Sequence, residues 1–509
     1  MSAEVYDAES YDAEGYDYVI AGGGAAGAVV AARLVERTSA RVLLLEAGGE
    51  AGLPAIRQTG IPGMAALWGD PAVTWPYVTV PQAGLAGRTV PLPQGRVLGG
   101  GSSINAMLYV RGNRRDYDGW AAQGNDGWSY DEVLPCFRRA EDYGDGAGPH
   151  HGTGGPMTVS RLSAMSEVSR AFLRAAAELG FPGGEDWDYN GAVQEGAFAY
   201  QSTRTKDEQR SSTAFSYLDP LRGHPRLTVL TGATATRVLL DGTVATGVEY
   251  VRDGAVHRAE ASTEVIVSCG ALASPKLLML SGIGPAAALR EHGLAVAADL
   301  PGVGANLHDH LILGVAYAAR SELPLPELLA EVGLFPPGDP DLQLLFGPVQ
   351  FVADEYRVDG PVFTFAPVLA RPRSRGTLAL RSADPADAPL VDPRYLAEPA
   401  DLAALVRGIE LCRELAHTAA LCSFHDRESA PGRGTDLAAY VRATATTVWH
   451  PVGTCRMGPD QGAVVDPALR VRGIDRLRVA DASIMPSIPA GNTAAATVMI
   501  GERAADLLT

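Results

Sequence analysis

The chain has 509 residues and a formal net charge of −17, from 42 basic and 59 acidic side chains. This acidic balance argues against nucleic acid or an anionic membrane surface as a partner. The sequence is 46% hydrophobic, which suits a globular protein with a sizeable core, and its length would allow about three domains. No apolar run reaches membrane-spanning length, and no basic segment precedes an apolar stretch at the N-terminus, so we expect a cytoplasmic protein.

Residues 1–15 carry a short acidic direct repeat, Tyr6–Ser10 followed by Tyr11–Gly15, and they lack aliphatic periodicity. We expect this tail to be disordered. An acidic docking tail is the alternative, with no other feature of the sequence to support it.

The first regular structure is expected directly after the tail, as a strand over Tyr16–Ala21. A glycine turn, a helix over Ala25–Arg37 and a buried strand over Arg41–Glu46 follow. This order predicts the first βαβ unit of a dinucleotide-binding fold. The segment Leu53–Gln94 is rich in Pro, Gly and Trp without clear periodicity, so we expect an ordered extension that packs across a neighbouring part of the protein.

The middle of the chain contains a series of short β-rich runs. Strands are predicted at Leu227–Leu230, Arg237–Leu240, Gly247–Tyr250 and Glu264–Ser268. A helix is predicted over Ser274–Ser281, opened by Pro275 and closed by Gly282.

The remaining elements suggest a second domain followed by a return to the first. Strand candidates between 311 and 445 are Leu342–Phe346, Val362–Val368 and Gly376–Arg381, with a helix candidate at Asp401–Leu415. The end of the chain contains a strand at Leu477–Ala480 and a helix at Thr493–Leu508. We therefore predict an α/β fold with a discontinuous, Rossmann-like cofactor domain over 16–155, 226–310 and 447–509. A smaller α+β substrate domain, built on an antiparallel sheet, is expected over 156–225 and 311–446.

The glycine turn Gly22–Gly27 has the spacing GxGxxG. Gly22 allows the tight turn, Gly24 lets a pyrophosphate approach the backbone, and Gly27 lets helix and strand pack closely. The helix N-terminus, at Ala25 and Ala26, offers free N–H groups and the positive end of the helix dipole to phosphates.

Glu46 ends the next predicted strand, where a carboxylate would accept the hydroxyls of a ribose. A solvated charge at a strand end is the alternative. The glycine motif and Glu46 together do not distinguish FAD from NAD.

Further segments complete a pattern along the chain. By itself, Arg96–Asn105 is a tight glycine- and serine-rich loop or a phosphate nest, and Gly270–Gly284 is a capped helix with an apolar face. Near the C-terminus stand His450–Met457, Arg478–Pro486 and the pair Asn492 and Thr493.

Together and in this order, these segments resemble the glucose–methanol–choline (GMC) oxidoreductases, from about Tyr16 to the C-terminus. The branch similar to choline dehydrogenases and to aryl-alcohol or hydroxymethylfurfural oxidases matches best. The resemblance implies FAD and the oxidation of a small-molecule alcohol by hydride transfer to flavin N5, with the electrons passed to oxygen or another acceptor. On the same fold, a non-redox lyase similar to hydroxynitrile lyases, a light-driven fatty-acid decarboxylase and a non-catalytic flavin-binding protein remain alternatives.

The resemblance also implies roles for single residues. The Leu98–Leu108 loop should run along the flavin ring, with Asn105, Ala106 and Met107 near its reactive edge. Residues 234–236 should reach the adenine, and Asp481 should hold the ribityl and phosphate end. Further cofactor contacts at matching positions are Ala47, Val97, Gly101, Ser102, Leu108, Ala235, Gly270, Ala482, Asn492 and Thr493.

His450 and Asn492 match the catalytic pair of the family. A histidine suits removal of the hydroxyl proton because its pKa lies near neutrality. An amide beside it can hold the substrate oxygen and stabilise the developing alkoxide. In isolation, a histidine before a proline in an apolar segment is more often a packing residue, and the matched position is what favours the catalytic role.

Other positions bear on the cofactor and substrate. Relatives with covalent flavin often carry a histidine where this chain has Ile104, so we expect FAD to be bound non-covalently. Choline-specific relatives place a glutamate where this chain has Ile312, which favours a neutral or aromatic alcohol. We expect no metal, and we interpret His308–His310 as a structural segment.

Overall fold

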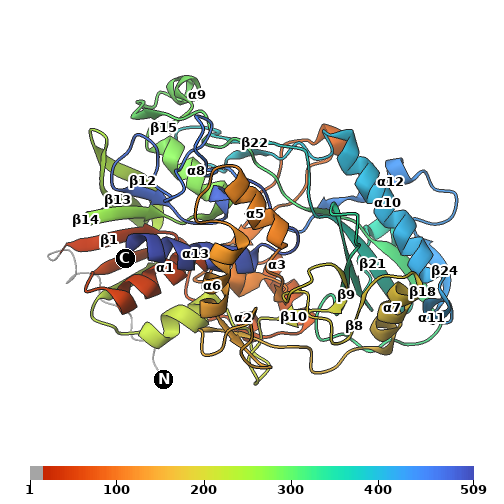
Figure 1. Cartoon of the computed structure of the whole chain (residues 1–509). Coiled ribbons are helices and arrows are strands. Elements are labelled where there is room, and N and C mark those ends of the chain that lie inside the picture. Colours follow the sequence, from red (N-terminus) through yellow and green to blue (C-terminus); the bar gives the residue numbers. More distant parts are fainter. Residues whose placement is uncertain (1–14) are drawn as a thin grey trace.

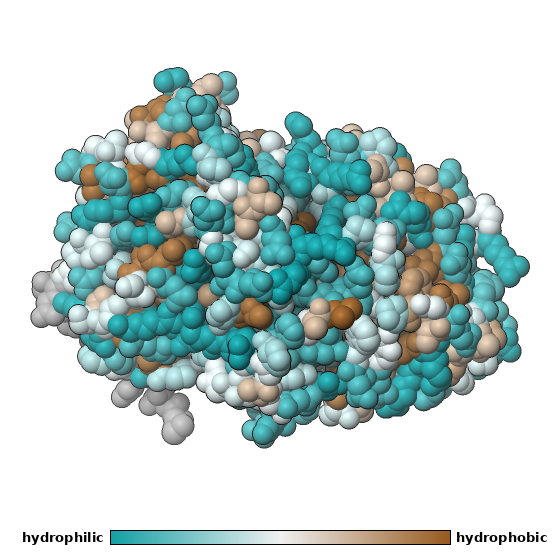
Figure 2. Space-filling model, viewed as in Figure 1, coloured by the Kyte–Doolittle hydropathy of each residue, from teal (hydrophilic) through white to brown (hydrophobic). Residues whose placement is uncertain are grey.

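The computed structural model describes residues 15–509, so the predicted tail lies outside the described residues except for Gly15. Figure 1 shows the elements gathered around two sheets at opposite ends of the molecule, one containing β1 and the other containing β21. On the face in Figure 2, hydrophobic residues are interspersed with hydrophilic ones. Within residues 15–509, no helix is both long and apolar enough to cross a bilayer.

The sheet at the first end is seven-stranded, in the order β11-β2-β1-β14-β13-β12 with β26 beside β14. Its strands are β1 (Tyr16–Ala21), β2 (Val42–Glu46), β11 (Leu227–Thr231), β12 (Thr234–Asp241), β13 (Val244–Arg252), β14 (Ala255–Val267) and β26 (Leu477–Val479). The strands β11, β2, β1, β14 and β26 pair in parallel, whereas β14, β13 and β12 form an antiparallel meander. Because these strands come from widely separated parts of the chain, the predicted discontinuous Rossmann-like layer is confirmed.

The helix α1 (Ala25–Arg37) packs along this sheet, and α13 (Ala494–Leu508) packs against α1. Gly501 permits this approach, since a Cβ at that position would lie 2.8 Å from the Cβ of Val29. The predicted limits of α1 are confirmed, and α13 begins one residue after the predicted start.

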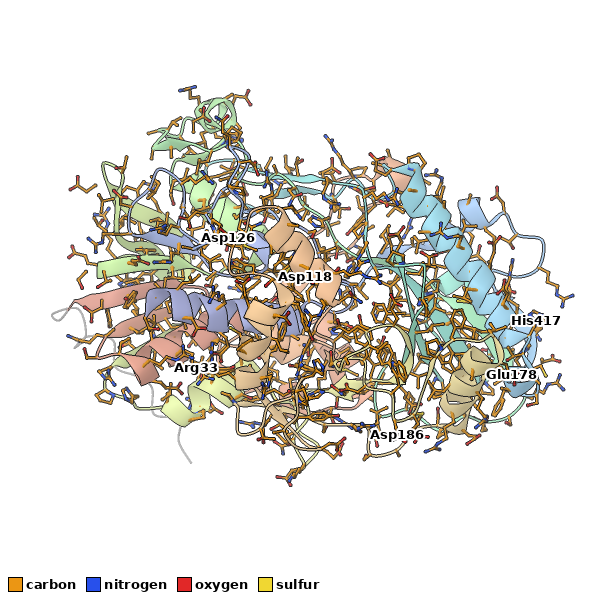
Figure 3. All side chains as sticks on the ribbon, viewed as in Figure 1. Arg33, Asp118, Asp126, Glu178, Asp186 and His417 are labelled. Carbon is orange, nitrogen blue, oxygen red and sulfur yellow. The ribbon has the colours of Figure 1, made fainter. Side chains whose placement is uncertain are left out.

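Glu502 anchors α13 from inside the protein, where it is fully buried. Its carboxylate accepts hydrogen bonds from Arg33 of α1 at 2.7 Å, from Arg139 of α6 (Tyr130–Ala140) at 2.7 Å and from the Tyr217 hydroxyl at 2.8 Å. Figure 3 labels Arg33 on its helix. Removing one partner from a buried ion cluster leaves an uncompensated charge, so this cluster fixes the helix whose first turn follows Asn492.

The helix α8 covers Gly270–Leu280, so it begins four residues before the predicted start and contains Pro275 rather than opening on it. Proline has no N–H, and the carbonyl of Ala271 therefore lacks its helical donor. The hydroxyl of Thr454 donates to that carbonyl at 2.6 Å. This bond replaces the missing one and ties the segment after His450 to α8.

The predicted extension over residues 53–94 is ordered and contains α2 (Pro54–Arg57), α3 (Ile61–Trp68), β3 (Thr74–Trp75), η2 (Ala83–Leu85) and the start of β4 (Gln94–Gly95). It contacts the segment around β23 (Leu390–Asp392), within the predicted substrate domain. Gln82 donates to Asp392 at 3.0 Å and accepts from the N–H of Tyr395 at 3.0 Å. The sequence did not reveal α3, because it is only eight residues long and lies in a segment without clear apolar periodicity.

The second sheet is nine-stranded, in the order β24-β18-β21-β20-β19-β9-β8, with β17 paired to β21 and to β25. Its strands are β8 (Gly183–Gly184), β9 (Gly196–Ala199), β17 (Leu311–Ile312), β18 (Val315–Ala319), β19 (Val332–Phe335), β20 (Leu342–Gly347), β21 (Val362–Leu369), β24 (His425–Ala430) and β25 (Thr446–Thr447). Its pairs are antiparallel apart from β8 with β9, which confirms the predicted antiparallel sheet. The helices α7 (Glu167–Glu178) and α10 (Pro399–Ala416) pack against it over a core that includes Phe172, Phe346 and Phe365.

Shorter elements connect these layers. The predicted strand Gly376–Arg381 is only β22 (Thr377–Ala379), and it pairs with β23 (Leu390–Asp392) outside the large sheet. The other elements are α4 (Gly101–Ile104), β5 (Leu108–Tyr109), α5 (Arg114–Ala122), β6 (Glu141–Tyr143), β7 (Met157–Val159), β10 (Gln201–Ser202), η3 (Ala214–Leu218), η4 (Asp219–Leu221), β15 (Ile283–Gly284), α9 (Ala286–Glu291), β16 (Ala298–Asp299), η5 (Asp354–Tyr356), α11 (Ala419–Cys422), α12 (Leu437–Thr444) and η6 (Ala482–Ile484).

Candidate active site

A cavity of about 340 Å³ is lined by residues from both sheets. From the first sheet it receives residues at the carboxyl ends of parallel strands, including Gly22 after β1, Glu46 at the end of β2 and Asp481 after β26. From the second sheet it receives Ile312 and Ala366. Crevices at the carboxyl ends of parallel strands are the usual ligand sites of open α/β sheets.

The site residues predicted from the sequence line this cavity, except Gly27, Val97 and Thr236. Gly27 lies in the contact between α1 and β1, where a Cβ would collide with the carbonyl oxygen of Gly22. This is the close helix–strand packing predicted for it. Val97 has a side chain that is fully buried in the core and a backbone that pairs with Gly49, and its contact with the cofactor stays a prediction.

The glycine turn forms a concave backbone surface. Gly22 has a φ of 103°, and a Cβ there would collide with the carbonyl of Ser268. Gly100 closes the other side so tightly that a Cβ on it would lie 2.8 Å from the Cα of Gly24. The N–H groups of Ala25 and Ala26, at the first turn of α1, have no acceptor within residues 15–509. The turn therefore offers unpaired donors at a helix N-terminus, which suits a phosphate.

Glu46 is buried with 6% of its surface exposed, so it is not a solvated charge at a strand end. Its Oε2 accepts the N–H of Gly23 at 2.9 Å and its Oε1 accepts the N–H of Gly48 at 2.7 Å. Burial raises the pKa of this carboxyl group to about 7, although these two bonds favour the charged form. Each oxygen keeps a lone pair that could accept a hydroxyl.

Asp481 organises the neighbouring turn. Its Oδ2 accepts the N–H of Gly270 at 2.8 Å and the hydroxyl of Ser274 at 2.5 Å, and its Oδ1 accepts the N–H of Ser483 at 2.8 Å. Burial raises its pKa. This aspartate therefore holds the first turn of α8 against the segment that follows β26, at the wall of the cavity.

His450 is oriented by His310, whose Nδ1 lies 3.1 Å from the Nδ1 of His450. The Nε2 of His310 lies 3.0 Å from the carbonyl oxygen of Ala370. Since a carbonyl only accepts, the proton of His310 is on Nε2. Burial lowers the pKa of His450 to about 4 and that of His310 well below its usual range, so both rings are neutral near pH 7.

These assignments determine the tautomer of His450. The Nδ1 of neutral His310 accepts, so the Nδ1 of His450 carries a proton and donates to it. The Nε2 of His450 is then an unprotonated acceptor without a partner in the described residues, on a side chain that lines the cavity. An unprotonated imidazole nitrogen in this position can accept a proton from a bound molecule.

Asp309 holds the backbone of both histidines. One carboxylate oxygen accepts the N–H of His450 at 2.8 Å and that of His310 at 2.9 Å. The other accepts the hydroxyls of Tyr395, at 2.6 Å, and of Thr447. Burial raises the pKa of Asp309 to about 6.

His308 has a different role from its neighbours. Its Nδ1 donates to the carbonyl of Asn306 at 2.6 Å, and its Nε2 accepts the N–H of Ile488 at 2.8 Å. Both ring nitrogens are used within the protein, as the interpretation of this segment as structural implies. Among residues 15–509, no group of three or more His, Cys, Asp or Glu side chains is arranged to hold a metal ion.

Asn492 lines the cavity just before α13. Its Oδ1 is buried without a hydrogen-bond partner, although buried amide oxygens are normally paired. Its Nδ2 has no acceptor in the described part of the chain and is free to donate. Two residues earlier, the N–H of Ala490 donates to Asp116 at 2.8 Å, and Asp116 also accepts from Arg371 at 2.8 Å. These bonds fix the segment that carries Asn492.

The wall formed by the second sheet is apolar. It includes Ile312, Leu345, Phe346, Phe351 and Ala366. At one side, the rings of Trp68 and Trp449 are 4.9 Å apart. The sequence did not reveal Trp68 as part of this wall, because it lies in the segment without clear periodicity.

Two threonine hydroxyls reach this wall, and both are engaged within the protein. Thr364 donates to the carbonyl of Val349 at 2.6 Å. Thr447 donates to Asp309 and accepts the N–H of Trp449 at 2.7 Å. The wall therefore presents an apolar surface even where a threonine contributes to it.

Two family models described as GMC oxidoreductase match this chain, one over residues 16–312 and the other over residues 372–501. The chain belongs to the GMC oxidoreductase family. It is 39% identical to the alcohol dehydrogenase [acceptor] of Pseudomonas putida, over 97% of this chain and 95% of the relative. It is 41% identical to the mitochondrial choline dehydrogenase of Homo sapiens, over 96% of this chain and 89% of the relative.

The similarity extends to solved structures. The crystal structure of pyridoxine 4-oxidase from Mesorbium loti has a TM-score of 0.92 at 35% identity, over 96% of this chain and 98% of that one. A formate oxidase variant from Aspergillus oryzae has a TM-score of 0.87 at 27% identity, over 98% of each chain. This GMC oxidoreductase is thus an FAD-dependent enzyme that acts on CH–OH groups.

The cavity of this GMC oxidoreductase fits FAD. The glycine turn, with its unpaired N–H groups, would hold the pyrophosphate, and Glu46 would accept ribose hydroxyls. The unpartnered Oδ1 of Asn492 would find a donor on the bound cofactor or on ordered water. These observations agree with the positions that the sequence resemblance assigns to the cofactor.

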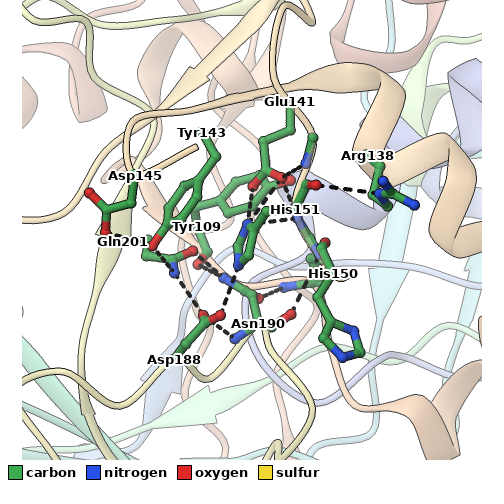
Figure 4. A network of polar contacts seen from close by, with 12 residues as sticks. Tyr109, Arg138, Glu141, Tyr143, Asp145, His150, His151, Asp188, Asn190 and Gln201 are labelled. Carbon is green, nitrogen blue, oxygen red and sulfur yellow. Dashed lines mark hydrogen bonds and ion pairs between the residues drawn. The ribbon is translucent and has the colours of Figure 1, made fainter. Parts of the chain in front are cut away.

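A second polar network lies outside the cavity lining, around His151 (Figure 4). Its Nδ1 lies 3.0 Å from Glu141, and its Nε2 lies 2.8 Å from Asp188. Arg111 pairs with Glu141 at 2.6 Å, and the ring of Tyr143 stacks on His151 at 3.9 Å. This network braces the segment that follows β5, whose residue Leu108 lines the cavity.

Proposed function

We propose that this enzyme oxidises an apolar alcohol, with Nε2 of His450 accepting the hydroxyl proton and Asn492 holding the hydroxyl oxygen. The observation that supports this most is the chain of hydrogen bonds from Ala370 through His310 to His450, which leaves Nε2 unprotonated on a side chain that lines the cavity. A general base must be unprotonated to act, and the lowered pKa of His450 keeps it so near neutral pH.

The oxidation breaks two bonds of the alcohol. The O–H bond of the alcohol breaks as its proton passes to His450, and the C–H bond of the same carbon breaks as hydride leaves, which gives an aldehyde or ketone. Bound FAD supplies the acceptor for that hydride at its N5 position. The free Nδ2 of Asn492 donates to the oxygen while negative charge develops on it.

The apolar wall supports an uncharged substrate. The threonine hydroxyls of this wall are engaged within the protein, so His450 and Asn492 are the polar groups that would bind the substrate hydroxyl. The remainder of the substrate would contact Ile312, Phe346 and the Trp68–Trp449 pair. Burying a trimethylammonium group against Ile312 is costly without an anion to replace its water. We therefore expect an aromatic or aliphatic neutral alcohol rather than choline, although a choline dehydrogenase is among the relatives.

An anaerobic alcohol panel tests this function. Benzyl alcohol, longer alkanols and choline would be mixed with the oxidised protein while the absorbance of the flavin is followed. Bleaching by apolar alcohols supports the proposal. A non-redox lyase, a light-driven decarboxylase and a non-catalytic flavin-binding protein would each leave the flavin oxidised in the dark. Efficient bleaching by choline alone would contradict the proposed substrate class.

The electron acceptor is oxygen or another oxidant, and the same panel can separate the two. Oxygen uptake and reduction of an artificial dye are followed in parallel with the best alcohol. Turnover with oxygen at a rate similar to that with the dye indicates an oxidase. Turnover with the dye alone indicates a dehydrogenase.

We further propose that FAD is held non-covalently. Ile104 lines the cavity at the position where covalent relatives often carry a histidine. Cys269 also lines the cavity, but its thiol donates to the carbonyl of Ala21 at 3.1 Å, and burial raises its pKa, so it is not a thiolate. Acid precipitation should release all of the flavin, and flavin that stays with the polypeptide on a denaturing gel would contradict this.

A further inference from the structure

Arg210 is a buried cation directly behind the loop that lines the cavity. It is 1% exposed and lies in the segment before η3, remote in sequence from that loop. Its Nη1 donates to the carbonyl and to the side-chain Oδ1 of Asn105, both at 2.7 Å, and lies 3.4 Å from the carbonyl of Ser102. Ser102 and Asn105 both line the cavity.

The charge of Arg210 has no anionic partner in residues 15–509. Its Nε donates to the carbonyl of Ile56 at 2.8 Å, and its Nη2 is buried without any partner. The neighbouring Arg57, whose carbonyl accepts the N–H of Arg210 at 3.2 Å, is itself a cation that pairs with Asp219 at 3.5 Å. Arg210 therefore contacts only neutral oxygens.

This arrangement differs from that of the other buried arginines. Arg111 pairs with Glu141 at 2.6 Å, and Arg204 pairs with Glu327 at 2.6 Å. Burial of an unpaired charge is costly, and burial alone lowers the pKa of Arg210 to about 9, which still leaves the group charged near pH 7. Uncompensated buried charges concentrate at functional sites, where their field acts on a ligand.

The guanidinium also fixes the shape of the loop. The Oδ1 of Asn105 accepts the N–H of Met107 at 3.1 Å as well as the Arg210 bond. Met107 has a φ of 61°, in the left-handed region that is uncommon for residues other than glycine. A conformation of this kind persists only where surrounding bonds determine it, and Arg210 bonds both the backbone carbonyl and the side-chain oxygen of Asn105.

We propose that Arg210 is a positioning residue with an electrostatic role: it fixes the Asn105 turn, and its unpaired charge stabilises the negative charge that reduction places on the bound flavin. The proposal rests on FAD binding in the cavity, and it is independent of which alcohol is oxidised and of the role of His450. Because the charge is buried, its effect is only weakly screened by salt.

The test compares variants that separate charge from shape. Arg210→Met removes the charge, Arg210→Gln removes it while keeping a donor, and Arg210→Lys keeps the charge without the planar fork. Arg204→Gln is the matched control, since Arg204 is buried in the same turn but is paired with carboxylates. The readouts are the midpoint potential of the protein-bound flavin, by anaerobic dye equilibration, and the dissociation constant of sulfite, an anion that adds to electron-poor flavins. Neither readout needs the alcohol, so failure of the proposed oxidation would be seen separately.

Loss of the charge should weaken sulfite binding about tenfold or more, as expected for one charge acting through a protein interior over several ångströms. A tenfold change in the two-electron reduction equilibrium lowers the midpoint potential by about 30 mV. Arg210→Lys and Arg204→Gln should each stay within about threefold of the wild type. A neutral variant that binds FAD with the wild-type potential and sulfite affinity would overturn the proposal. If neither neutral variant retains FAD, Arg210→Lys decides, because a tenfold or larger loss in a variant that keeps the charge also overturns it.

Discussion

The Nδ1 atoms of His310 and His450 lie 3.1 Å apart, and the two rings stand nearly perpendicular, at 81°. A contact between two like atoms is a hydrogen bond only if one carries the proton and the other does not. The carbonyl of Ala370 can only accept, so the proton of His310 is on Nε2 and its Nδ1 is the acceptor for the Nδ1 proton of His450. The backbone carbonyl of the residue directly after β21 thereby sets the tautomer of a side chain in the cavity.

Removing His310 should impair His450 without removing the cofactor. In His310→Phe, the Nδ1 proton of His450 loses its acceptor, and the ring is free to change tautomer and orientation. Loss of such an orienting partner typically costs about 10- to 100-fold, and we expect anaerobic flavin reduction to slow by that factor at unchanged FAD content. His310→Asn, which keeps an acceptor oxygen, should recover part of the rate. Equal, wild-type rates in both variants would show that His310 only fills space.

The pH dependence of flavin reduction should reflect the lowered pKa of His450. Burial lowers that pKa to about 4, so the base stays unprotonated, and the rate should stay level, from neutral pH down to about pH 5. The rate should then fall as the pH passes through about 4 and His450 gains its proton. Rapid-mixing pH jumps with the best alcohol measure this before the protein can unfold. A midpoint near 6.5, the value of an exposed histidine, would contradict the buried neutral base.

The periodic elements of the fold were predictable because their signals are local. Consecutive residues are enough to recognise the glycine turn between β1 and α1. The same holds for the apolar runs of β20 and β21. The start of α8 was predicted four residues too late, at Ser274, because a proline such as Pro275 is common in the first turn of a helix. The hydroxyl that replaces the missing hydrogen bond of this proline comes from Thr454, which is distant in sequence.

The site was only partly predictable, for the same reason. His450 and Asn492 were found through motifs, whereas the pairing of His310 with His450 joins residues 140 positions apart. No sequence pattern identifies Arg210, because the absence of a described carboxylate near its guanidinium group depends on the tertiary fold. Such relations depend on tertiary packing, which periodicity and spacing do not encode.

His151 should stabilise the fold more at low pH than at high pH. Burial disfavours its charge, but hydrogen bonds to Asp188 and Glu141 outweigh burial and raise its pKa. A raised pKa means that the stabilisation is fully present below about 6.5, the unfolded value, and is lost as the pH rises through the folded value. Urea unfolding of the wild type and His151→Gln should therefore differ more at pH 5.5 than at pH 9. The opposite trend would mean that His151 is neutral in the folded protein.

The most direct test of the proposed chemistry is the anaerobic rate of flavin reduction in His450→Ala. The variant should keep its FAD, because the glycine turn and Glu46 lie elsewhere in the cavity. Its rate should fall by about 10²- to 10⁴-fold, the usual contribution of a positioned general base, and higher pH should restore part of it. The control is His417→Ala, an exposed histidine at the end of α10 (Figure 3), which should reduce its flavin normally. If His450→Ala folds, holds FAD and is reduced at the wild-type rate near pH 7, His450 is not the base.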